Sequence, residues 1–181
     1  PTHPNVGSNP NVRTASAGGV FTECPGQCGR FDTMVGMVMV DVDDVKAAAK
    51  RISGRHVRTP LLPWPLAGEQ VWLKPENLQP TGAFKLRGAS NAIGMLSEAV
   101  RAAGVVTHSS GNHGRAVAWA ARQYGVPAVV VMPDTTPQVK VEGVRDLGAE
   151  VVLVPAAERE SRAEAIRAER GGALVPPFDH P

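Results

Sequence analysis

The sequence is short of cysteine, of aromatic side chains and of any excess charge of one sign. Its 181 residues include two cysteines and 4% aromatic side chains, and 19 basic residues stand against 17 acidic ones for a net charge of +2. A nucleic-acid-binding surface needs clustered basic residues, and the sequence contains no such block. No apolar run approaches the ~18 residues of a membrane-spanning helix. We therefore expect no nucleic-acid partner and no membrane partner.

Both cysteines, Cys24 and Cys28, lie near the N-terminus. No second Cys/His pair stands at the spacing of a zinc site, so we expect incidental reduced thiols and no metal. The N-terminus also lacks the charged region followed by an apolar one that marks a secretory signal. Together these absences predict a cytoplasmic protein.

The first 33 residues have a composition unlike that of the rest. They contain no Leu, Ile, Trp or Tyr and much Pro, Gly, Asn, Ser and Thr. Such a stretch cannot bury enough apolar area to offset its ordering entropy. We interpret residues 1–33 as a disordered tail or as sequence upstream of the true start.

The second half of the chain alternates apolar, β-branched segments with helical patterns. The strand centres recur about every 23 residues, a spacing typical of β-α units in a parallel sheet. Uninterrupted valine runs fit strands that are covered on both faces. The predicted strands are Val105–Thr107, Ala128–Met132, Val151–Val154 and Leu174–Val175. The predicted helices are His113–Tyr124, Gln138–Leu147 and Arg159–Arg170. The fold class is therefore α/β, an open parallel sheet with helices on both faces, with a ligand at the carboxyl ends of the strands.

The region before this repeat is less regular. Apolar spacing after Asp41, a good N-cap, predicts a helix over 42–52. Prolines exclude helix over 56–68. A short strand is predicted at Val71–Leu73, and a helix from about Leu86 to Ala99.

Two segments carry chemistry-bearing side chains. Lys85 opens a helix after a Thr-Gly turn, where the helix dipole and nearby Arg87 disfavour the charged ammonium and favour an amine nucleophile. A solvated lysine at a helix start is the alternative, and the residues alone favour it. The segment Ser109–Gly114 lies between a strand and a helix, and its glycines let backbone N–H groups approach an anion. A polar turn with Ser and Asn as caps explains that segment equally well.

Taken together, these segments resemble the serine/threonine dehydratase and serine racemase family of fold-type II enzymes, which use pyridoxal phosphate (PLP). The resemblance runs from about residue 45 to residue 181. The segments that carry it are Arg58-Thr-Pro-Leu61, Lys74–Ala89, Ser109–Gly114, Met132-Pro133 with Pro137 and Lys140, and Gly148–Val151. It implies a sheet like that of the tryptophan synthase β subunit, PLP as cofactor and a small hydroxy amino acid as substrate.

For the cofactor, the resemblance implies three contacts. Lys85 would form the Schiff base with PLP and would also take the Cα proton of the substrate. Phe84 would pack near the cofactor ring. Asn112 would bond the 3-hydroxyl oxygen of the cofactor.

For the substrate, the resemblance implies that Ser109, Asn112 and His113 hold the carboxylate. Ser110 stands where serine racemases have their opposite-face acid/base. Arg162 looks like a family arginine near the substrate anion. The implied reaction is β-elimination of a serine- or threonine-type amino acid to a keto acid and ammonia, with racemisation of serine left open by Ser110.

Two parts of the family pattern are missing: the glycine-rich loop around the cofactor phosphate, and a late Ser or Cys that meets the pyridine nitrogen. Both belong to the second half of family members. We therefore interpret residues 34–98 as the N-terminal part of the large PLP domain, 99–175 as the small α/β domain, and 176–181 as a truncated crossover. We expect this chain to be an inactive, aggregation-prone fragment, and the full-length protein to be a homo-oligomer.

Two other interpretations stay open. One is a β-replacement enzyme related to cysteine synthase, although that branch usually has Asn-Thr-Gly where this chain has Asn112-His113-Gly114, and an acidic residue where it has Leu86. The other is a non-catalytic remnant or an α/β binding module, which the fold alone does not exclude. Capture of the cofactor by Lys85 would discriminate a remnant from an enzyme.

Overall fold

A computed structural model of the chain describes residues 40–66 and 69–178. The predictions for residues 1–33, including Cys24 and Cys28, and for the end of the crossover at 179–181 lie outside the described residues. Within the described part, no helix has the length and apolar character needed to cross a membrane.

The parallel sheet predicted from the strand repeat is present. Its strands are β3 (Val105–His108), β4 (Ala128–Pro133), β5 (Glu150–Val154) and β6 (Ala173–Leu174), all parallel, in the order β5-β4-β3-β6. Every residue of β3 is buried, as are the first five residues of β4. Because the strands are parallel, their ends share one carboxyl edge, where open α/β sheets bind ligands.

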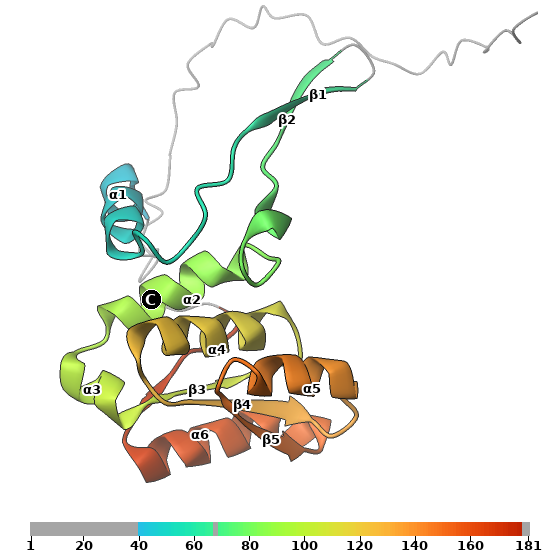
Figure 1. Cartoon of the computed structure of the whole chain (residues 1–181). Helices are drawn as coiled ribbons and strands as arrows, with labels where there is room; N and C mark the ends of the chain where they lie inside the picture. The colour runs from blue at the N-terminus through green and yellow to red at the C-terminus, as the bar shows by residue number, and fades with distance from the viewer. Residues whose placement is uncertain (1–39, 67–68, 179–181) are drawn as a thin grey trace, which may run out of the picture. The chain divides into compact units, whose positions relative to one another are not determined.

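Helices cover both faces of this sheet, as predicted (Figure 1). α4 (Asn112–Tyr124) and α5 (Gln138–Arg145) pack on one face, and α6 (Arg159–Arg170) packs on the other. Alternate residues of β4 separate the two cores: Val130 and Met132 join the α4 side, while Val129 and Val131 join the α6 side. The valine run is apolar throughout because both of its faces are buried.

The region before the sheet begins with four elements. α1 (Val42–Arg51) begins at Asp41, whose side chain accepts from Asp44 N–H while the Asp44 side chain accepts from Asp41 N–H. β1 (Leu62–Leu66) and β2 (Glu69–Leu73) form an antiparallel pair, followed by the short 3-10 helix η1 (Glu76–Leu78). The prediction that Asp41 caps the first helix is confirmed.

A second 3-10 helix, η2 (Ala156–Glu158), lies between β5 and α6.

Two details of this region differ from the sequence prediction. The Pro-rich stretch is not merely non-helical, because it contains β1, where prolines are tolerated in a strand with one open edge. The single helix predicted over 86–99 is wrong. The chain forms α2 (Lys85–Met95) and then α3 (Glu98–Ala103), because the Ser97 side chain caps a new helix by accepting from Val100 N–H.

Large apolar side chains stay exposed outside the sheet. Trp64 on β1 is 54% exposed, and Trp72 on β2 is 52% exposed. Such side chains are a physical basis for the expected aggregation of the isolated chain. The division into domains at residues 98 and 99 stays a prediction, and α2 shares a buried core with α4 across that point.

Gly114 allows α4 to lie close to the sheet. A Cβ atom at this position would stand 2.5 Å from Ser109 O and 2.9 Å from Val130 Cγ1. Both distances are shorter than real Cβ contacts, and the first neighbour is backbone that cannot rotate away. Any side chain here would push the helix off β4 and shift the turn at Ser109.

We expect Gly114→Ala to lower the free energy of unfolding by about 1–3 kcal/mol, the usual cost of forcing an extra methyl group into a packed site. Gly111→Ala is the matched control, because a Cβ at Gly111 meets nothing within 4 Å. Urea denaturation of the two variants measures the difference. Equal stability of both would contradict the close approach.

Candidate active site

The turn after β3 presents hydrogen-bond donors at the carboxyl edge of the sheet. α4 begins at Asn112 with Gly111 as N-cap, and among the described residues no side chain caps its first turn. Its first N–H groups are therefore free to bind an anion, and the helix dipole favours one there. Ser109 and Ser110 are half-buried beside these groups, and Ser109 Oγ accepts from Gly111 N–H at 3.2 Å. The anion-binding alternative for this turn is thus geometrically supported.

His113 is held in one orientation. The ring is buried, and Nε2 lies 3.0 Å from the carbonyl oxygen of Val175, just after β6. A carbonyl only accepts, so Nε2 carries the proton in this contact. Burial lowers the pKa of His113 below its ordinary value of 6.5, against the opposing effect of the bond to Val175. His113 is therefore a neutral, fixed side chain near neutral pH.

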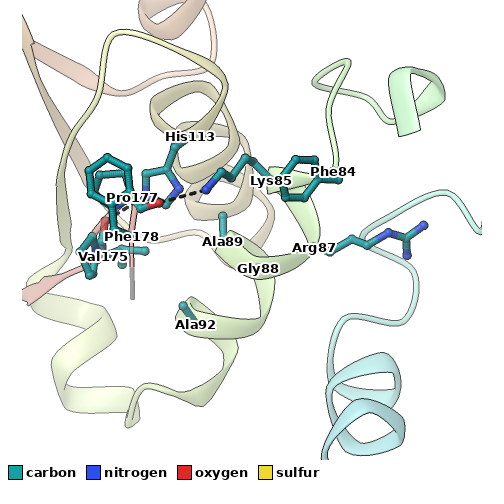
Figure 2. Close-up of a pocket in the computed structure, with 11 residues that line it drawn as sticks. Phe84, Lys85, Arg87, Gly88, Ala89, Ala92, His113, Val175, Pro177 and Phe178 are labelled. Carbon is teal, nitrogen blue, oxygen red and sulfur yellow. Dashed lines mark hydrogen bonds between the residues drawn. The ribbon is translucent and has the colours of Figure 1, made fainter. Parts of the chain in front are cut away.

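Lys85 reaches the same short segment. Its Nζ donates to the carbonyl oxygen of Pro177 at 2.9 Å (Figure 2). α2 brings it there because Ala89 and Ile93 of α2 pack in the core that α4 helps to form. Lys85 and His113, 28 positions apart in the chain, thus bond to carbonyls two residues apart.

A cavity of about 690 Å³ opens around Lys85 and His113. The remaining lining comes from the first turns of α2 and from the segment after β6. These residues are Phe84, Arg87, Gly88, Ala89, Ala92 and Val175–Phe178. Such a cavity is large enough for a small ligand.

A smaller hollow of about 220 Å³ adjoins this cavity, because Pro177 and Phe178 line both. Ser109, Ser110 and Gly111 line the small hollow, together with His108, Pro133 and Arg159. Asn112 lies in a third hollow, which it shares with Ser110, Arg115 and Lys140. The structure therefore places Phe84, Lys85 and His113 in one cavity, Ser109 and Ser110 in its neighbour, and Asn112 on the α5 side of the turn.

Arg162 lies away from these hollows. It stands on α6 with its side chain 44% exposed, 3.5 Å from Glu169, and lines none of the three. Arg159, one turn earlier, lines the hollow at Ser110 instead. The sequence does not single out Arg159, because Arg and Glu residues alternate along 158–170 in the pattern typical of a solvated helix face. Its place at the helix start after β5, at the carboxyl edge, was the usable signal.

A charged network fixes the chain before Lys85. Glu76 accepts from Arg87 Nε at 2.8 Å, from Thr59 Oγ1 at 2.6 Å and from Gln79 Nε2 at 3.1 Å. The Gln79 amide also bonds both backbone groups of Val57, at 3.0 and 2.8 Å. These bonds tie the 57–59 segment and η1 to the first turn of α2, which has no side-chain cap of its own among the described residues.

The same network changes the interpretation of Arg87. Its guanidinium points away from the Lys85 amine, as Figure 2 shows, and pairs with Glu76. The expectation that Arg87 disfavours the charged form of the Lys85 amine is therefore not supported, because Glu76 compensates the charge of Arg87. Arg87 instead anchors the helix that carries Lys85.

The Arg87 hydrogen bond lowers the pKa of Glu76 from its ordinary value of 4.5 to about 2. A depressed carboxyl pKa stabilises the fold above the unfolded value, and this contribution is lost as pH falls through the folded one. We expect Glu76→Gln to cost about 1–3 kcal/mol of unfolding free energy at neutral pH. The difference from the unmodified chain should shrink between pH 4.5 and 2. Denaturation at stepped pH measures it.

Glu142→Gln, at an exposed position of α5, is the matched control. A stability difference for Glu76→Gln that does not change between pH 4.5 and 2 would contradict the assigned pKa.

The residues around Lys85 fit PLP at its aldehyde end. A primary amine is the group that condenses with an aldehyde. The Phe84 ring lies beside that amine, with its centroid 5.7 Å from Nζ, and is itself 61% exposed, so an aromatic ligand can reach it. Among the residues that line this cavity there is no run of glycines of the kind that wraps a phosphate.

Comparisons with known proteins agree with this geometry. The family described as pyridoxal-phosphate dependent enzyme matches residues 52–181. An L-threo-3-hydroxyaspartate ammonia-lyase of Pseudomonas sp is 42% identical over 151 residues, which are 80% of this chain and 47% of that protein. The crystal structure of serine racemase from Dictyostelium discoideum superposes with a TM-score of 0.72 at 42% identity, over 76% of this chain and 47% of that one.

A threonine deaminase structure from T.th. also superposes with a TM-score of 0.72, at 43% identity, over 78% of this chain and 46% of that one. The chain thus spans about half the length of the curated relatives it matches. The matched residues include Lys85, the turn after β3 and the start of α6. The chain therefore belongs to the family of pyridoxal-phosphate-dependent enzymes.

Proposed function

We propose that this chain carries the amine-bearing and carboxylate-binding part of a PLP-dependent enzyme acting on serine- or threonine-type hydroxy amino acids. The reaction is β-elimination to a keto acid and ammonia, with racemisation of serine as a second outcome. One observation carries the proposal: Lys85 and His113 bond carbonyls two residues apart, so the amine and the anion-binding turn meet at one edge of the sheet. The similarity to a serine racemase and a threonine deaminase supports it.

Each residue has a distinct part in this proposal. Lys85 would hold PLP through Nζ, and once the amino group of the substrate has replaced it there, the freed Nζ would accept the Cα proton. PLP, when bound, supplies an electron sink for the charge left at Cα. The uncapped N–H groups of α4, with Ser109 and Asn112, bind the substrate carboxylate. His113 is neutral and is held in place by its bond to the Val175 carbonyl, so it adds no positive charge to the site. Its fixed ring limits how the carboxylate can rotate.

Ser110 is proposed to return a proton to Cα from the face opposite Lys85. It lines the small hollow, whereas Lys85 lines the large cavity, and Pro177 and Phe178 line both. Groups on two sides of a substrate are what racemisation requires, because the proton leaves from one face and returns to the other. Phe84 covers the cofactor ring at the entrance of the large cavity.

We expect Lys85→Ala to abolish the visible absorption that PLP gains when it condenses with a lysine. Lys50→Ala, on the exposed face of α1, is the matched control and should leave the absorption unchanged. A spectrophotometric PLP titration of the two variants and the unmodified chain measures the effect. Unaltered absorption in Lys85→Ala would contradict the proposed function.

We expect Ser110→Ala to separate the two faces of the reaction. Because the isolated chain is expected to be inactive, the test uses the full-length protein. In deuterated water with PLP, exchange of the α-proton of D-serine should fall about 10²-fold or more, the usual contribution of a general acid or base. Exchange of the α-proton of L-serine, which depends on Lys85, should persist. Proton NMR of both enantiomers measures the rates. An equal loss for both would assign Ser110 to carboxylate binding instead.

A further inference from the structure

The short segment after β6 contacts both the Lys85 amine and the start of α4. The Pro177 carbonyl accepts from Lys85 Nζ at 2.9 Å (Figure 2). The Val175 carbonyl lies 3.0 Å from Nε2 of His113. Pro177 also lines both the large cavity and the small hollow. Residues 175–178, which we call the strap, therefore border both spaces of the candidate site.

The strap is fixed at its first residue. The Val175 N–H donates to the Val106 carbonyl of β3 at 2.8 Å, so both backbone groups of Val175 are bonded, one to β3 and the other to His113. Val175 is 3% exposed and belongs to the core that also contains Ala89 of α2. The strap therefore begins at a point that the sheet and α4 hold together.

Two prolines extend from this fixed point to the Lys85 amine. A proline ring locks φ at about −65°, and a proline also restricts the residue before it. Pro176 therefore restrains Val175, and Pro177 restrains Pro176, so the Pro177 carbonyl cannot turn freely away from Lys85. Because prolines have no N–H group, the backbone of residues 176 and 177 offers acceptors only, whereas a lysine amine is a donor.

The bond to Pro177 opposes the condensation of Lys85 with an aldehyde. Condensation forms a C=N bond between Nζ and the aldehyde carbon, and two hydrogens of the amine leave with the aldehyde oxygen as water. The amine must give up the Pro177 carbonyl to bring its lone pair to that carbon. A hydrogen bond that is lost on condensation lowers the affinity of the amine for the aldehyde.

We propose that the strap restrains Lys85, with the Pro177 carbonyl holding the amine back from PLP. The bond from His113 to Val175 keeps the strap in place. Because the strap also borders the hollow at Ser110, its withdrawal frees the amine and changes that hollow in one movement. This inference rests on the proposed function, because it takes Lys85 as the group that holds PLP. His113 acts here as a positioning residue, through the strap.

The first test loosens the strap and measures the affinity of the chain for PLP by spectrophotometric titration. Pro176→Gly should raise the affinity about threefold or more, as expected for the loss of one competing hydrogen bond. His113→Leu, which loses the donor to Val175, should also raise it. His113→Gln, whose amide can replace that donor, should bind PLP like the unmodified chain. Pro63→Gly, at an exposed position of β1, is the matched control and should change nothing.

A second readout needs no PLP. Acetic anhydride acetylates accessible amines, and peptide mass spectrometry resolves each lysine. In Pro176→Gly and in His113→Leu, acetylation of Lys85 should rise about threefold or more relative to the exposed Lys50. Lys74 donates to a backbone carbonyl outside the strap at 2.6 Å. Its acetylation should stay constant, which shows that the fold is intact.

The double variant shows whether His113 acts through the strap. If it does, Pro176→Gly with His113→Leu should gain no more than the larger single effect, because both substitutions release the same restraint. Additive gains would overturn the positioning role of His113. Unchanged acetylation of Lys85 in both single variants would overturn the restraint itself. Failure of Lys85 to capture PLP in every variant would overturn the proposed function, whereas acetylation still decides whether the strap restrains the amine.

Discussion

The close approach of Gly114 to the sheet is the constraint on which the rest of the site depends. With no Cβ at this position, the first turn of α4 lies against Val130 and the carbonyl of Ser109. The turn between β3 and α4 is then held tightly enough to present Ser109, Ser110 and uncapped N–H groups at the carboxyl edge. Helix packing in the core thereby fixes the uncapped N–H groups of α4 at the carboxyl edge, where we propose that an anion binds.

The position of Lys85 also depends on α4, through the packing of α2 against it. α2 packs in the core that α4 helps to form, and the Glu76–Arg87 pair ties the first turn of α2 to η1 and the 57–59 segment. The amine is thus placed from both sides, by apolar packing on one and by a charged network on the other. Preorganisation of this kind is what a reactive amine needs, because small displacements at a site cost rate.

Much of this arrangement could be predicted from the sequence, and the failures have physical causes. The sheet and its helices were predictable because valine runs and helical patterns repeat regularly, and the turn at Ser109–Gly114 falls where a strand gives way to a helix. β1 was missed because Pro63 and Pro65 argue against regular structure in general. The break before α3 depends on one capping bond of Ser97, which local composition does not show. Arg87 turns toward Glu76, a partner 11 positions away in the chain. Arg159 lies beside the turn after β3 because both are at the carboxyl edge of the sheet. Neither side-chain direction can be predicted from local sequence.

The central claim is that Lys85 alone among the lysines is placed to hold PLP. The most direct measurement is to incubate the chain with PLP, reduce with borohydride and locate the modified residue by peptide mass spectrometry. The account predicts a stoichiometric label confined to Lys85. A label spread over exposed lysines such as Lys46, Lys50 and Lys140, with no preference for Lys85, would contradict it.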